Sequence, residues 1–161
     1  MNAKGTSYNL AAIEASSETF YISQAGIKGN RFDAENKTIE WSPSTVSYDD
    51  ETNIMRSPLT TLAHEAGHAA HYIKDADSYR ANAYTIVDKY DRAEEQITIT
   101  TTEQYAARKH GEISGEQVTR FKHYSTLYPG VQPYFTAMSM EQILNYVIEN
   151  NKLQGAVKIS E

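Results

Sequence analysis

The sequence contains no cysteine, and this absence excludes three kinds of site. Disulfide bonds, zinc sites with thiolate ligands and cysteine nucleophiles all need that residue. The cellular compartment stays open, because a cytosolic protein and a protein that crosses a membrane can both lack cysteine.

Long apolar runs and clusters of positive charge are missing as well. No stretch reaches the roughly 18 apolar residues of a membrane-spanning helix, and residues 1–10 lack the apolar segment of a signal peptide. The 15 Lys and Arg residues are scattered among 21 Asp and Glu, which gives a net charge of −6. We therefore expect neither nucleic acid nor a membrane as the main partner. No feature of the sequence indicates an oligomeric state.

The composition is that of an ordinary globular protein, with 40% hydrophobic and 22% charged residues in a chain of 161. This length allows one domain with a sizeable core. We predict a single α+β domain over residues 1–161. Its expected parts are a loose lead-in, a small β region, the helices that carry the site, and a C-terminal helix with a tail, over residues 1–18, 19–56, 57–128 and 129–161.

Short apolar runs between polar turns predict the β region. Strands are expected at Phe20–Ser23, Arg31–Phe32 and Thr38–Trp41. The last two flank the polar turn Asp33–Lys37 and therefore predict a hairpin. The polar stretch Ser44–Asn53 is predicted to be a loop.

A strong start signal opens the helical part at Ser57-Pro58, where serine can cap a helix and proline suits its first turn. Apolar residues then recur at helical spacing to about Lys74. A glycine that can end a helix, Gly111, and similar signals predict further helices. These are expected over residues 78–97, 102–109, 114–127 and 140–150.

The first of these helices carries the sequence HEAGH at residues 64–68. His64 and His68 are four residues apart, so their imidazoles lie on one helix face and can share one zinc ion. Glu65 can act as the general base on a zinc-bound water, whose pKa zinc lowers to about 7. Gly67 lowers helix propensity by about 1 kcal/mol relative to alanine, so we expect another element to come close to the helix there.

The rest of the ligand set follows by exclusion. The form HExxHxxGxxH is excluded because His71 and Lys74 occupy the positions of its glycine and third histidine, and the zinc deaminase pattern needs cysteine. What remains is a carboxylate ligand from a later helix, with water in the fourth position. The candidates are Glu94, Glu95 and Glu103.

The pair Glu94-Glu95 is favoured, because the chain between it and His68 is long enough for a helix to return to the metal. Thr98, three residues after Glu95, is expected to support that residue. We expect His71 to have a supporting or packing role, since three ligands from one helix would crowd the ion. Glu103 is expected to pair with Arg108 across a helix turn.

These segments resemble a known group of zinc peptidases. Residues 57–71 resemble the zinc helix of the clostridial neurotoxin light chains and, more closely, that of the NleD-like effector metallopeptidases of bacteria. Residues 92–98 resemble the Glu-Glu-x-x-Thr segment of those families, whose second glutamate is the zinc ligand, and this implies Glu95. Arg120 and Tyr124 resemble the closing Arg and Tyr of the effector pattern, and in the toxin light chains such an Arg and Tyr line the catalytic cleft.

The resemblance implies a small zincin-like metalloendopeptidase that hydrolyses a protein or peptide substrate. Zn²⁺ would be held by His64, His68 and Glu95, with Glu65 as base, and the oxyanion would be stabilised by residues drawn from Arg120, His123 and Tyr124. Such an effector or toxin would be secreted or delivered to a target cell as part of a longer bacterial protein. Three alternatives stay open: a metal-binding but inactive interaction domain, a repressor-cleaving peptidase, and a helical interaction domain with a chance motif.

Overall fold

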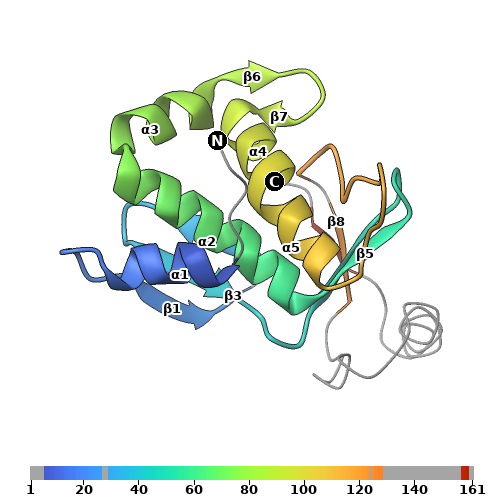
Figure 1. The fold of residues 1–161 in the computed structure, drawn as a ribbon, viewed down its shortest axis with the longest axis horizontal. Coiled ribbons are helices and arrows are strands. Elements are labelled where there is room, and N and C mark those ends of the chain that lie inside the picture. Colours follow the sequence, from blue (N-terminus) through green and yellow to red (C-terminus); the bar gives the residue numbers. More distant parts are fainter. Residues whose placement is uncertain (1–5, 27–28, 124, 129–156, 160–161) are drawn as a thin grey trace.

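The structure is a computed structural model that describes residues 6–26, 29–123, 125–128 and 157–159. Short strands form small sheets, most of them in the N-terminal half, and helices follow (Figure 1). The predicted α+β class is confirmed. The single domain over residues 1–161 stays a prediction.

The N-terminal sheet supports the central helix from one side. Strand β3 (Thr38–Trp41) pairs in parallel with β1 (Tyr21–Gln24) and antiparallel with β2 (Arg31–Asp33). The predicted hairpin of β2 and β3 is therefore confirmed. Phe32 and Ile39 face each other across it and are buried in the main hydrophobic cluster. Three residues of the central helix complete this cluster: Leu62, Ala66 and Ala69.

A second sheet contains a hairpin that we did not predict. Residues 44–53 were expected to be a loop, but β4 (Val46–Asp49) lies within them and pairs with β5 (Ile54–Arg56). The side chain of Asp49 accepts hydrogen bonds from the backbone N–H and the hydroxyl of Thr52. The polar residues that suggested a loop therefore close a turn, as aspartate often does. Strands β8 (Ser125–Tyr128) and β9 (Val157–Ile159) complete the order β5-β4-β8-β9.

The central helix is α2 (Pro58–Lys74), and it begins where the sequence predicts. The Ser57 hydroxyl accepts a hydrogen bond from the backbone N–H of Thr60, the geometry of a helix N-cap. Its first three turns are largely buried, because α1 (Thr6–Glu14), both sheets and the later helices surround it (Figure 1). The histidine motif therefore lies in the interior.

The predicted helix over residues 78–97 is wrong. The chain forms α3 (Ala76–Tyr84), then the hairpin of β6 (Ile86–Val87) and β7 (Asp91–Arg92), and then a new helix, α4 (Ala93–Thr98). Asp91 has a positive φ of 63°, a turn conformation that aspartate tolerates better than most residues. The hairpin reverses the chain, and α4 then packs against α2.

The predicted helix over residues 102–109 is confirmed in its helical residues and in its end at residue 109. Its separate start is wrong, because the helix that begins at residue 93 continues without a break to residue 109. Its middle, η1 (Ile99–Glu103), is a π-helix, and α5 (Gln104–Lys109) follows. In a regular α-helix, two side chains eight residues apart differ in direction by about 80°, because eight residues make two full turns and a further 80°. The wider π turn removes most of this offset, so Glu95 and Glu103 both face α2.

The predicted helix over residues 114–127 is wrong as well. Residues 114–123 form an irregular segment with one turn and several bends, and residues 125–128 form β8. Thr119 and Arg120 are buried in this segment, so their contacts with other elements outweigh its helical pattern. The predicted helix over residues 140–150 lies outside the described residues. Among the helices that the structure describes, none has the length and apolar surface needed to cross a bilayer.

Gly67 lies where α2 packs against the helix formed by α4 and η1. A Cβ atom at this position would lie 3.0 Å from Cγ2 of Thr98 and 3.1 Å from Oγ1 of Thr102. The expectation that another element comes close at Gly67 is confirmed. The bare backbone there lets the two helices pack tightly enough for their polar side chains to meet.

We predict that Gly67→Leu destabilises the protein by about 1–3 kcal/mol, because overpacking must push the helices apart. Gly67→Ala should lose less, since alanine recovers about 1 kcal/mol of helix propensity. Urea unfolding measures both, with Ala81→Leu on the exposed face of α3 as the control. If Gly67→Leu lowers the free energy of unfolding no more than the control does, the tight helix packing inferred at Gly67 is contradicted.

Candidate metal centre

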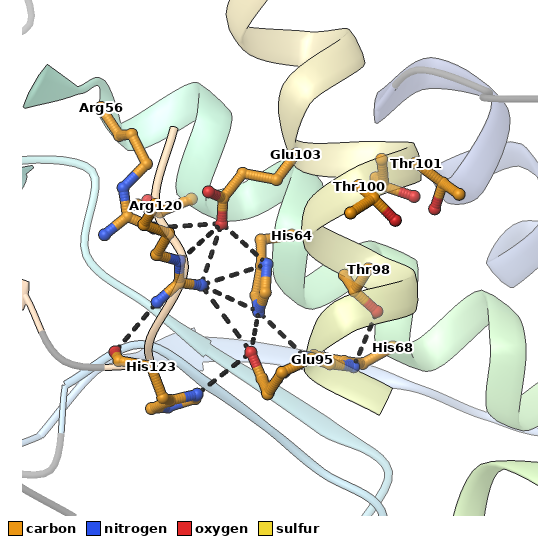
Figure 2. A network of polar contacts seen from close by, with 12 residues as sticks. Arg56, His64, His68, Glu95, Thr98, Thr100, Thr101, Glu103, Arg120 and His123 are labelled. Atoms are coloured by element: carbon orange, nitrogen blue, oxygen red, sulfur yellow. Dashed lines mark hydrogen bonds and ion pairs between the residues drawn. The ribbon is translucent and has the colours of Figure 1, made fainter. Parts of the chain in front are cut away.

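Three buried side chains from two helices converge on one point. They are His64 and His68 of α2 and Glu95 of α4 (Figure 2). The Nε2 atoms of the two histidines are 2.9 Å apart. The Glu95 carboxylate lies 3.2 Å from Nε2 of His64 and 3.1 Å from Nε2 of His68. Candidate ligand atoms of all three residues lie within 4.8 Å of one another.

These atoms fit a small metal ion. A tetrahedral zinc ion with bonds of about 2.0–2.1 Å keeps its ligand atoms about 3.3 Å apart, close to the separations in the cluster. Two Nε2 atoms that face each other at 2.9 Å must share a proton in a metal-free protein, whereas an ion between them would use both lone pairs. Two imidazoles and a carboxylate are also a known ligand set of catalytic metal sites. The cluster can therefore hold a metal ion.

The charges of the site favour cations. Burial lowers the pKa of His68, but the neighbouring carboxylates, mainly Glu95 and Glu94, raise it to about 10. Burial raises the pKa of Glu95, whereas the imidazoles of His68, His64 and His123 hold it well below its usual range. Glu95 is therefore ionised at neutral pH, and a metal ion would compete with the proton of His68.

Glu94 orients the His68 ring through its Nδ1 atom. Its Oε1 lies 3.1 Å from Nδ1 of His68, and its Oε2 lies 2.8 Å from Nδ1 of His71. Thr98 lies 3.2 Å from the same Nδ1 of His68. The expectation that Thr98 supports Glu95 is wrong, because its hydroxyl contacts His68 and Glu94 instead. These contacts leave Nε2 of His68 directed at Glu95, as the outer partners of a metal-binding histidine do.

Glu103 holds His64 in the same way. Its Oε2 lies 2.8 Å from Nδ1 of His64 and accepts hydrogen bonds from Nη1 of Arg56 at 3.0 Å and Nη2 of Arg120 at 2.9 Å (Figure 2). Burial raises the pKa of Glu103, but the two guanidinium groups hold it well below its usual range. We call these four residues the Glu103 cluster.

The predicted pair of Glu103 with Arg108 is wrong. The π turn directs Glu103 inward, and Arg108 donates instead to the carbonyl oxygens of Gly115 and Gln117. Arg56 was missed altogether, because a single arginine at the end of a strand belongs to no motif. The one feature of the sequence that could have indicated a buried Arg56 is its position directly after Ile54 and Met55 and before the helix cap Ser57.

Arg120 and His123 complete the site on the side of Glu95. Nη2 of Arg120 is 3.9 Å from Oε2 of Glu95, and its Nη1 donates to the carbonyl oxygen of His123. Nδ1 of His123 lies 3.1 Å from Oε2 of Glu95, and 30% of the His123 side chain is exposed. Glu65 lies between His64 and His68 in the sequence and is buried. Its charge contributes to the raised pKa of His68. Tyr124, also predicted here, lies outside the described residues.

We predict that Glu103→Gln destabilises the metal-free protein by about 3–5 kcal/mol at pH 7, because it leaves two buried arginines without their counter-charge. The ionised Glu103 stabilises the fold fully above its unfolded pKa of about 4.3, and this contribution is lost as pH falls through the lower folded value. The difference in the free energy of unfolding between wild type and variant should therefore be the same at pH 7 and pH 5. It should become smaller below about pH 4.

Urea unfolding with a chelator measures this gap. The exposed Glu116→Gln is the control and should change stability by at most about 0.5 kcal/mol. An equal loss in both variants, or a gap as large at pH 3 as at pH 5, would contradict the assigned charge state.

Comparison with known proteins gives the chain a family. Residues 4–116 match the profile of the family Peptidase_M91, described as “Effector protein”. The match covers more than half of the chain and includes both histidines, Glu95 and Glu103. No curated protein and no solved structure matches the chain. The chain therefore belongs to this family of effector peptidases.

Proposed function

We propose that the protein is a zinc-dependent metalloendopeptidase that hydrolyses a peptide bond in a protein substrate. The observation that carries the proposal is the buried cluster of two imidazoles and one carboxylate, with Glu65 next to His64 in the sequence. His64, His68 and Glu95 would hold the ion, and three protein ligands are the usual number in catalytic zinc sites. Bound zinc would polarise the scissile carbonyl and make water a nucleophile at neutral pH.

Zinc is favoured over other ions by what surrounds the ligands. The same ligand set also suits ferrous iron in oxygenases. Here a glutamate lies directly between the two histidines in sequence, and hydrolysis needs such a base. Membership of a peptidase family supports the same choice. The intact Glu65 also disfavours an inactive metal-binding domain.

The side chains have separate roles in this mechanism. Glu65 takes a proton from the attacking water and passes it to the leaving amine. Arg120 contributes a positive charge close to Glu95, where it can stabilise the oxyanion. Tyr124 follows His123 in the chain and is proposed as a second donor to the oxyanion. Glu94 and the Glu103 cluster keep the two imidazoles in position.

An effector acts on a protein of another cell. We therefore propose delivery to a host cell, with a protein substrate there, in keeping with the family. The family supports neither a repressor-cleaving peptidase nor a helical domain with a chance motif. The expectations of no nucleic acid and no membrane as partner remain predictions.

We predict that purified wild type binds one zinc ion per chain and that Glu95→Ala binds it at least about 100-fold more weakly. Glu94→Gln is the matched neighbour. This variant keeps all three proposed ligands. Its zinc affinity should therefore fall only about 10-fold to 100-fold, the usual effect of losing a residue that orients a ligand. Competition with a chromophoric chelator measures each affinity. Unchanged zinc binding by Glu95→Ala would transfer the ligand role to Glu94 or Glu103.

We predict that Glu65→Gln keeps its zinc but loses about 10²-fold to 10⁴-fold in kcat, the usual contribution of a general base. Cleavage of an unfolded, fluorescently labelled casein is the measurement. Glu35→Gln, on the exposed turn between β2 and β3, is the control and should retain full activity. Full activity of Glu65→Gln would show that another group serves as the base.

A further inference from the structure

An open cavity of about 510 Å³ adjoins the metal centre on the side of Glu95 and His123. This volume is in the range of known ligand pockets, about 300–1,000 Å³. The rest of its lining belongs to the β6–β7 hairpin: Ile86, Val87, Asp88, Asp91 and Arg92. Because the cavity reaches a proposed metal ligand, a side chain next to the cleaved bond can enter it.

The wall of the cavity is held in place by the segment that carries His123. The backbone N–H of His123 donates to Oδ2 of Asp91, and the rings of Tyr90 and Phe121 meet edge to face. Nζ of Lys89 lies 3.7 Å from the centre of the Phe121 ring. Asp91 adopts its positive φ at this point, and such strain persists where surrounding contacts enforce it. The cavity is therefore formed before a substrate binds, which reduces the cost of ordering it.

The lining contains both apolar and acidic residues. Ile86 is 76% exposed although it is a large apolar residue, and Val87 beside it is half-buried. Asp88 and Asp91 contribute two carboxylates against the single guanidinium of Arg92. Within the described part of the chain, no cation pairs with the exposed Asp88 carboxylate. The whole chain also carries a net charge of −6, which attracts cations to such a cavity.

We propose that this cavity is a specificity subsite for a lysine or arginine side chain of the substrate, an inference that rests on the proposed peptidase function. The aliphatic stem of such a side chain would pack on Ile86 and Val87 while its charged end stays near water. The charge would lie beside Asp88 and Asp91. An acidic side chain would meet the same two carboxylates, against the single guanidinium of Arg92.

The test maps cleavage sites in a mixture of proteome-derived peptides by mass spectrometry, using the zinc-loaded protein. Wild type should cleave where lysine or arginine occupies one fixed position within a few residues of the bond. Asp88→Lys should lower kcat/KM about fivefold to tenfold for a basic peptide relative to its glutamate-substituted counterpart, mostly through KM. Arg92→Gln should strengthen the preference for basic residues.

Glu35→Lys is the matched control, because it changes the charge equally on the distant turn between β2 and β3. It should leave the preference unchanged, and zinc content confirms that each variant is folded. Cleavage that depends on Glu65 but shows no basic preference, or a preference that survives in Asp88→Lys, overturns the subsite and leaves the peptidase proposal standing. If no peptide is cleaved in a Glu65-dependent way, the proposed function fails and this inference fails with it.

Discussion

An ionised carboxylate lies at the centre of this molecule without contact with solvent. Glu103 is fully buried, and its Oε2 contacts Arg56 of β5, His64 of α2 and Arg120 of the segment before β8. A buried charge is tolerated only when its partners are all in place. The four elements that supply these residues must therefore all be in place in the folded structure. The constraint selects one arrangement of the elements, whatever it contributes to net stability.

The candidate metal centre depends on this constraint and on a second, similar contact. His64 is oriented through Nδ1 by Glu103, and His68 is oriented through Nδ1 by Glu94. In both rings Nε2 is then left to face Glu95. All three glutamates come from the continuous helix of α4, η1 and α5, so one helix supplies the proposed ligand and the residues that orient both histidines. The π turn makes this possible by bringing Glu103 onto the same face as Glu95.

The parts that could be predicted from the sequence depend on neighbours along the chain. The capped start of α2, the spacing of its two histidines and the β2–β3 hairpin all arise from local turn and helix chemistry. The errors occur where distant contacts decide the structure. Residues 114–127 have a helical pattern, yet the burial of Arg120 against Glu103 requires an irregular path. Arg56 donates to Glu103, which lies 47 residues later in the chain, so only the folded structure reveals this role.

The broken helix between residues 78 and 97 is the most informative of these errors. A continuous helix would have matched local propensity and carried Glu95 past α2 without the reversal. The chain instead turns at the β6–β7 hairpin, with Asp91 in a conformation that few residues adopt. Local preference and final structure disagree most often where function imposes a requirement. Here the reversal has two results: α4 begins close enough for Glu95 to reach both histidines, and the hairpin becomes the wall of the cavity beside them. One departure from helix thus links the candidate ligand set to the cavity proposed to receive a substrate side chain.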